Sequence, residues 1–195
     1  MNTNVSNEKW KPNVILADAD YIDSVAFDLI VNFERMIGRR IPQADFARWI
    51  DCVALDGGLR EGDNETQVVL IHRKETTQLK NFTPGNLAAE LDGKAFKDNL
   101  GEFLISSIAI ENELPSGDDL FIESLKVISN AAEVKRLMVV AADDNYAKVK
   151  DVLRHADDEK RITVFSMQPM LGGNFRQEIL GYSLMNALGI KSSEL

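Results

Sequence analysis

The sequence predicts a three-layer α/β domain with a mainly parallel sheet. Short apolar runs alternate with segments in which apolar residues recur at helical spacing. Strands separated by helices of this length are typical of parallel crossovers, and apolar runs without polar alternation are typical of strands covered on both faces. We therefore expect a Rossmann-like fold with five strands in the order 3-2-1-4-5.

Five strands are expected from the apolar runs. They cover residues 14–18, 67–72, 103–110, 136–142 and 161–167. Residues 1–13 form a polar N-terminal tail. Residues 14–195 form one α/β domain, because no repeat, low-complexity tract or linker interrupts them.

Helices are expected between the strands from apolar periodicity and capping residues. The first runs from Ser24 to Ile37, after a cap at Asp23 or Ser24, and Pro42 opens a second that ends before Gly57. The remaining helices are expected at residues 83–91, where Thr83 is the cap and Pro84 the first helical residue, and at 116–132, 145–156 and 175–188.

Composition narrows the function classes. The chain has 195 residues, of which 45% are apolar and 27% charged, as in a soluble globular domain. A formal net charge of −9 argues against an open basic surface for nucleic acid. No apolar run suits a membrane span, and the first residues lack signal-peptide features, so we expect a cytoplasmic protein. One cysteine, expected in the core, and two histidines leave little material for zinc sites or nucleophilic triads.

Acidic residues follow two strands that are expected to be neighbours. Asp18 and Asp20 come after the first strand, and Asp143 and Asp144 come after the fourth. In this fold the carboxyl ends of those strands border the crevice where ligands bind. Converging carboxylates repel one another unless a cation lies between them, and Mg²⁺ or Mn²⁺ favours carboxylate oxygens. The sequence therefore predicts an acidic, cation-binding crevice.

A third acidic group surrounds Asp119 and Glu123, which are four residues apart and share a helix face. Structural roles are the alternative explanation for these residues. Asp119 is favourable in a first helical turn, Glu123 can simply be solvated, and Asp144 can cap the helix that follows it.

Three short motifs resemble the PIN-like nucleases, and among them the NYN branch. They are VILAD at the first strand, SGDD at the mid-chain helix, and VVAADDNY at the fourth strand, followed by VKDVLRHADDEKRITVF. The resemblance covers most of residues 14–166 and implies a PIN-like fold, a metal-dependent nuclease activity and a magnesium or manganese cofactor. It implies catalytic and metal-binding roles for Asp18, Asp119 and Asp143.

The chain departs from that family pattern at several positions. Tyr21 stands where the family has asparagine, and Ala141 and Ala142 replace a serine and a glycine. Asn145 replaces the second aspartate of the fourth-strand motif and can still coordinate a metal through its amide oxygen. Asp20 and Asp144 are candidates to supply the missing metal ligands.

A substrate path is expected on the loop after the second strand. Arg73, Lys74 and Lys80 make it locally basic, and it leads to a predicted helix start that favours an anion. Phe82 either stacks on a base or packs in the core. The expected partner is single-stranded RNA, bound weakly. His72 and His155 are expected to be structural.

The last predicted helix is unusually apolar. Its apolar residues are Leu180, Leu184, Met185 and Leu188, and Gly172 and Gly173 permit a tight turn before it. Such a helix either completes the core or pairs with a second copy in a homodimer.

Three functions stay open from the sequence. The first is a PIN/NYN-like metal-dependent ribonuclease, or a degenerate relative of one. The second is a non-catalytic binding or regulatory module on the same fold. The third is a haloacid dehalogenase-like phosphatase with Asp18 as nucleophile and Asp20 as acid, although Tyr21 and Ile22 would crowd an incoming phosphate.

Overall fold

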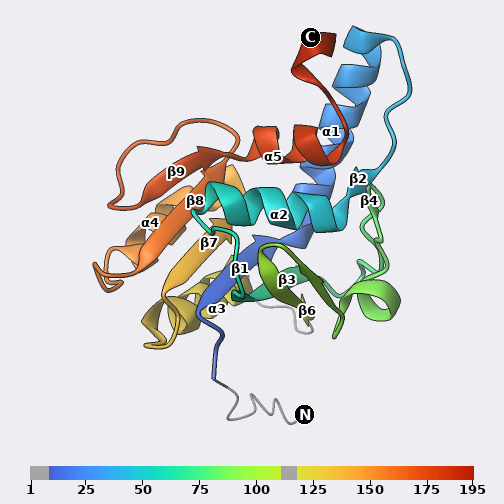
Figure 1. Ribbon diagram of the computed structural model, residues 1–195. Coiled ribbons are helices and arrows are strands. Elements are labelled where there is room, and N and C mark those ends of the chain that lie inside the picture. The colour runs from blue at the N-terminus through green and yellow to red at the C-terminus, as the bar shows by residue number, and fades with distance from the viewer. Residues whose placement is uncertain (1–8, 111–117) are drawn as a thin grey trace.

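A mostly parallel seven-stranded sheet forms the centre of the computed structural model, which describes residues 9–110 and 118–195 (Figure 1). The strand order is β5-β6-β3-β1-β7-β8-β9, and only β5 runs antiparallel to its neighbour. The α/β class is therefore confirmed. The strands are β1 (Asn13–Asp18), β3 (Glu65–Arg73), β5 (Ala95–Asp98), β6 (Gly101–Ile110), β7 (Arg136–Val140), β8 (Arg161–Ser166) and β9 (Arg176–Ile179).

The five strands expected from sequence are all present in the expected order, but the sheet is larger than predicted. Antiparallel β5 extends one edge and parallel β9 extends the other. Both added strands are short and mix exposed with half-buried residues, so neither carries the apolar run that marks a central strand. β2 (Ala44–Asp45) and β4 (Phe82–Thr83) pair separately as a small second sheet.

Side chains of the central strands alternate between two cores. Ile15 and Ala17 of β1 face α1, α2 and α5, whereas Val14 and Leu16 face α3 and α4. All four residues are fully buried. The sheet is therefore covered on both faces, and the three-layer arrangement is confirmed. The helices are α1 (Ala19–Ile37), α2 (Phe46–Asp56), α3 (Asp118–Asn130), α4 (Tyr146–Leu153) and α5 (Leu180–Ala187).

Helix α1 begins five residues earlier than predicted. Asp18 is its N-cap, and neither Asp23 nor Ser24 is. The sequence does not reveal the first turn, because Asp18 both ends β1 and caps α1, so that no loop separates the two elements. The helix ends at Gly38, which adopts the left-handed conformation at φ 75°.

The segment after β4 also differs from the prediction. Thr83 belongs to β4, and Pro84 does not open a helix. A single π-helical turn, Leu87–Leu91, begins after Asn86, whose side chain accepts a hydrogen bond from the amide of Ala89 at 2.9 Å. The expected N-terminal anion site is therefore absent from this loop, because one short turn replaces the helix. Similarly, Asp45 rather than Pro42 sets the start of α2.

The C-terminal helix is shorter than predicted because its first third is strand β9. Gly172 and Gly173 lie in the left-handed region, at φ 82° and 94°, in the loop before that strand. Leu180, Leu184 and Leu188 are buried in the protein's own core, so α5 completes the core, which was one of its two expected roles. Pairing with a second copy stays a prediction.

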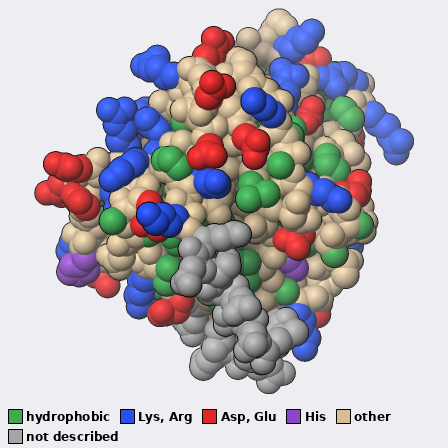
Figure 2. All heavy atoms as spheres, turned by 60° about the horizontal axis from the view of Figure 1, so that its bottom comes forward, with side chains coloured by type: hydrophobic (Ala, Val, Ile, Leu, Met, Phe, Trp, Pro, Cys, Tyr) green, Lys and Arg blue, Asp and Glu red, His purple; other side chains and the backbone are tan. Residues whose placement is uncertain are grey.

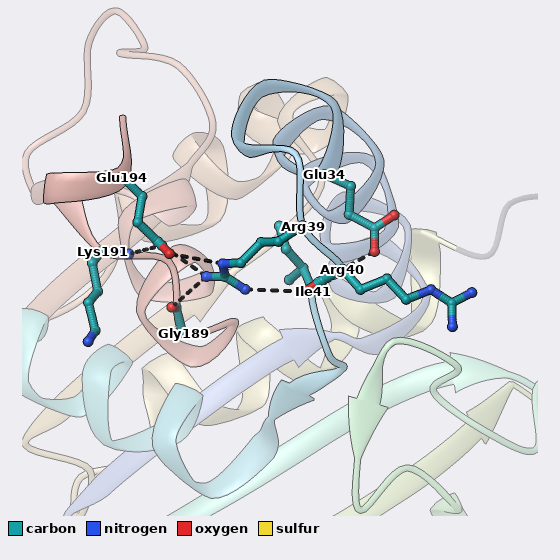
Figure 3. A network of polar contacts seen from close by, with 7 residues as sticks. All are labelled: Glu34, Arg39, Arg40, Ile41, Gly189, Lys191 and Glu194. Carbon is teal, nitrogen blue, oxygen red and sulfur yellow. Dashed lines mark hydrogen bonds and ion pairs between the residues drawn. The ribbon is translucent and has the colours of Figure 1, made fainter.

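Arg39 joins the end of α1 to the C-terminus (Figure 3). Its guanidinium donates to both oxygens of Glu194 at 2.9 Å and to the carbonyl of Gly189 at 3.2 Å. This hydrogen bonding lowers the pKa of Glu194 to about 2. The contact fixes the last residues against the helical layer that α1, α2 and α5 form.

The face drawn in Figure 2, which is the bottom of Figure 1 turned toward the viewer, carries interspersed charges of both signs. The net charge of −9 is therefore not gathered into one acidic patch on this face. In the parts of the chain that the structure describes, no helix combines the length and apolarity needed to cross a membrane.

Candidate functional site

The expected crevice lies where the order of the parallel strands reverses, between β1 and β7. These strands pair in parallel, with Ala17 opposite Val140, so their carboxyl ends lie side by side. Asp18 is the last residue of β1. Asp143 is the first residue of the 3-10 turn Asp143–Asn145, which begins three residues after the last residue of β7, Val140. Such a switch point is the usual ligand site of open α/β sheets.

Asp18 has a structural role as well as its position in the crevice. One carboxylate oxygen accepts a hydrogen bond from the amide of Tyr21 at 3.0 Å, which caps α1. The residue is half-buried. Negative charge at a helix N-terminus is favourable, so part of the acidity after β1 is explained without a ligand.

Tyr21 packs its phenol beside Asp143. Burial and then the charge of Asp143 raise the pKa of Tyr21 to about 12, with a smaller effect from Asp144. The phenol therefore stays protonated. Asp143 also accepts a hydrogen bond from the amide of Met167, after β8, at 3.1 Å. Tyr21 is thus a neighbour of Asp143, one of the predicted site residues.

Asp20 holds the start of the loop after β3. Its carboxylate accepts hydrogen bonds from the amide of Arg73 at 2.7 Å and the hydroxyl of Thr76 at 2.5 Å, and lies 3.7 Å from the Arg73 guanidinium. These contacts give Asp20 a structural role, and its predicted metal-binding role stays a prediction. The positive charge that balances Asp20 comes from the protein itself.

Asp23 holds the end of the loop that follows β3, a role that the sequence does not indicate. Predicted as a helix cap, it instead accepts hydrogen bonds from the amides of Lys80 and Asn81, at 3.1 and 2.8 Å, and from the side-chain amide of Asn81 at 3.1 Å. Asp20 and Asp23 are three apart on one face of α1 and hold the two ends of the same loop. That spacing was the available signal, but the partner loop was not identifiable from it.

The remaining predicted ligands occupy different environments. Asp144 is exposed and Asn145 is buried, so the two differ in how readily solvent reaches them. Asp119 is the second residue of α3, and its side chain lies outside the described residues. Glu123 is exposed and pairs with Lys126 at 3.2 Å, which agrees with the solvated alternative.

The basic loop side chains Arg73, Lys74 and Lys80 are all exposed. Phe82 is not available to stack on a base. It is 1% exposed and packs edge-on against Phe46 and Trp49. The backbone of this loop is fixed by α1, while its cationic side chains reach solvent.

The two histidines and the cysteine are separate from the crevice. His72 is buried and its Nδ1 lies 2.7 Å from the carbonyl of Arg73. His155 is exposed just after α4. Cys52 is half-buried, and burial raises the pKa of its thiol. None of these groups meets Asp18 or Asp143 to form a nucleophilic site.

The predicted divalent cation would have two carboxylates, Asp18 and Asp143, as its ligands from the described residues. Among the residues that the structure describes, no three histidine, cysteine, aspartate or glutamate side chains are grouped to hold a metal ion. Asp18 and Asp143 nevertheless follow neighbouring strands, and Mg²⁺ is usually bound through one or two carboxylates and several waters. The metal-binding role of these two residues stays a prediction.

Fold and site together define an α/β protein with parallel strand order 3-2-1-4-5-6 and an acidic switch point. The chain belongs to the family described as "Family of unknown function (DUF6621)", which matches residues 7–195. No curated protein matches the chain. No solved structure matches it either.

Proposed function

We propose that the protein is a divalent-metal-dependent ribonuclease of the PIN/NYN-like type, acting on single-stranded RNA. The observation that carries the proposal is that Asp18 and Asp143 follow β1 and β7, two strands that pair in parallel. The motif resemblance assigns catalytic and metal-binding roles to both residues and to Asp119.

Each residue of the pair has a defined role. Asp18 and Asp143 hold the cation, and the Tyr21 phenol fixes the Asp143 carboxylate by donating toward it. A magnesium or manganese ion held there would supply an activated water and would offset the charge of the phosphodiester. Exposed Asp144 is the candidate additional ligand.

The basic loop supplies the contact to the RNA backbone. Arg73, Lys74 and Lys80 project from a loop that Asp20 and Asp23 hold on α1. A net charge of −9 opposes RNA binding, so these few cations must supply the attraction. Binding should be weak, with a salt slope of roughly two to four contacts at about 0.7 each.

Manganese-dependent cleavage of single-stranded RNA tests this proposal. Cleavage should be lost in Asp18→Asn and in Asp143→Asn, because each change removes a charged ligand. Both variants should stay folded, since asparagine is also a good N-cap and keeps an acceptor for the amide of Met167. Asp28→Asn, an exposed change on α1, is the charge-matched control and should cleave normally.

The same assay tests the loop. The double variant Arg73→Ala, Lys74→Ala should weaken RNA binding and leave the melting temperature almost unchanged, because both side chains are exposed. The double variant Arg35→Ala, Arg40→Ala removes equal charge at the other end of α1 and should bind RNA as the wild type does. Equal weakening by both pairs would exclude the loop as the RNA path.

A non-catalytic binding module is the second candidate. It is favoured by one observation, namely that Asp20 is engaged by Arg73 and Thr76 and is not available to replace a missing ligand. Metal-dependent RNA binding without cleavage would support this candidate. The phosphatase alternative is less well supported, because the Asp20 carboxylate that would act as its acid accepts hydrogen bonds from Arg73 and Thr76.

A further inference from the structure

Four arginines gather at the amino ends of the strands, at the opposite end of the sheet from Asp18 and Asp143. Arg136, Arg161 and Arg176 are the first residues of β7, β8 and β9, and Arg60 lies shortly after α2. These strands are parallel neighbours, with Arg136 directly opposite Arg161. Their amino ends therefore bring the arginines together.

A cavity of about 590 Å³ lies among these side chains, and we call it the arginine pocket. Its cationic lining residues outnumber its acidic ones, Asp157 and Asp158. The cationic residues are Arg60, Arg136, Lys160, Arg161 and Arg176. Apolar side chains, among them Ile162 and Phe175, line the pocket as well.

A glycine turn makes room for the arginines. Gly58 has φ 90°, and a Cβ placed on it would lie 2.7 Å from Nη1 of Arg136 and 3.7 Å from Nη1 of Arg176. The Arg136 guanidinium also donates to the carbonyl of Gly57 at 2.6 Å. Its Nε is buried and has no hydrogen-bond partner among the described residues. Two guanidinium groups thus converge on one small space.

The positive charges of this pocket are incompletely balanced. Arg176 pairs with Glu178 at 3.0 Å, but among the described residues no carboxylate lies within ion-pair distance of Arg60, Arg136 or Arg161. Burial, and then the neighbouring arginines, lower the pKa of Arg136. Arginine nevertheless stays protonated in proteins, so the repulsion is not relieved by proton loss.

We propose that the arginine pocket binds a phosphorylated small molecule of nucleotide size. Arginine is the preferred partner of phosphate because its planar guanidinium donates two parallel hydrogen bonds. The volume falls within the range of small-molecule sites, roughly 300–1,000 Å³, and exceeds what a lone phosphate ion fills. The apolar wall at Ile162 and Phe175 provides a surface for the non-phosphate part.

Titration of the full chain with adenosine monophosphate, in the absence of divalent metal, tests the proposal independently of the metal site. Calorimetry should detect binding that is tighter than that of inorganic phosphate at equal ionic strength. The double variant Arg60→Ala, Arg161→Ala should bind at least about tenfold more weakly, since charge-assisted hydrogen bonds are lost. Both side chains are exposed, and an unchanged melting temperature without ligand will verify the fold.

The double variant Arg35→Ala, Arg40→Ala is the control, because it removes the same charge outside the pocket. It should keep wild-type affinity. Absence of nucleotide binding, equal weakening in both pairs, or phosphate binding as tight as the nucleotide would each overturn the proposal. Single-stranded RNA binding that depends on Arg60 and Arg161, without nucleotide binding, would make the pocket a nucleic-acid contact instead.

Discussion

Asp51 of α2 and Asp98 of β5 form a carboxyl pair away from the crevice. Burial, and then hydrogen bonding and charge from Asp98, raise the pKa of Asp51 to about 7. One oxygen of Asp51 is buried without a hydrogen-bond partner among the described residues. The Asp51 carboxyl therefore holds its proton to a higher pH in the folded protein than in the unfolded chain.

The sign of the pH effect follows from the raised pKa. The folded state holds the Asp51 proton where the unfolded chain has released it, so this stabilisation is complete below about pH 4 and is lost as pH rises through about 7. Asp51→Asn imitates the protonated form. The variant should gain melting temperature over the wild type at about pH 8 and show little gain at about pH 4. A gain of equal size at both pH values, measured by thermal unfolding, would contradict the assignment.

At the scale of elements, the attachment of the 73–81 loop to α1 is the distinctive feature. Asp20 holds the start of the loop, and Asp23 holds its end at Lys80 and Asn81. The acidic residues that follow β1 are thus divided, with Asp18 at the crevice and the other two at the loop. The loop that presents the basic side chains is positioned by the helix that Asp18 caps.

Removing the second attachment should destabilise the protein. Asp23→Ala leaves the amides of Lys80 and Asn81 without their acceptor, at a cost of about 1–3 kcal/mol in the free energy of unfolding. Urea denaturation measures this change. Asp28→Ala, an exposed change on the same helix, should alter it by less than about 0.5 kcal/mol. Similar losses in the two variants would show that the Asp23 contacts add little.

Elements marked by apolar periodicity were predictable, whereas those held by tertiary pairing were not. The run VILA gave β1 because all four residues are buried between two helical layers. The sequence predicts a helix where strand β9 lies, because three of its four residues, Arg176, Gln177 and Glu178, are polar and pairing with β8 keeps them extended. The roles of Asp20 and Asp23 likewise depend on a loop more than fifty residues away.

The sequence carries a signal for the arginine pocket. Arg136, Arg161 and Arg176 each open a strand, and parallel neighbours bring such first residues to one edge. The signal is incomplete, because the sequence predicts a helix where β9 lies and so does not place Arg176 at the start of a strand. The crevice was easier to predict, since Asp18 and Asp143 follow strands with clear apolar runs.

In the whole molecule, opposite charges lie at the two opposite ends of the parallel strands. Carboxylates lie at the carboxyl ends of β1 and β7, and arginines at the amino ends of β7, β8 and β9. The chain has a net charge of −9, and the arginines form a local positive group within it. A cation at one edge and an anion at the other are therefore separate expectations with separate tests.

Metal binding at Asp18 and Asp143 is the central claim, and thermal unfolding with manganese tests it most directly. A ligand that binds only the folded state stabilises it by mass action, so manganese should raise the melting temperature of the wild type. The double variant Asp18→Asn, Asp143→Asn should show no such rise, while Asp28→Asn should respond as the wild type does. Equal rises in the wild type and the double variant, or no rise in the wild type, would contradict the assignment of this crevice as a metal site.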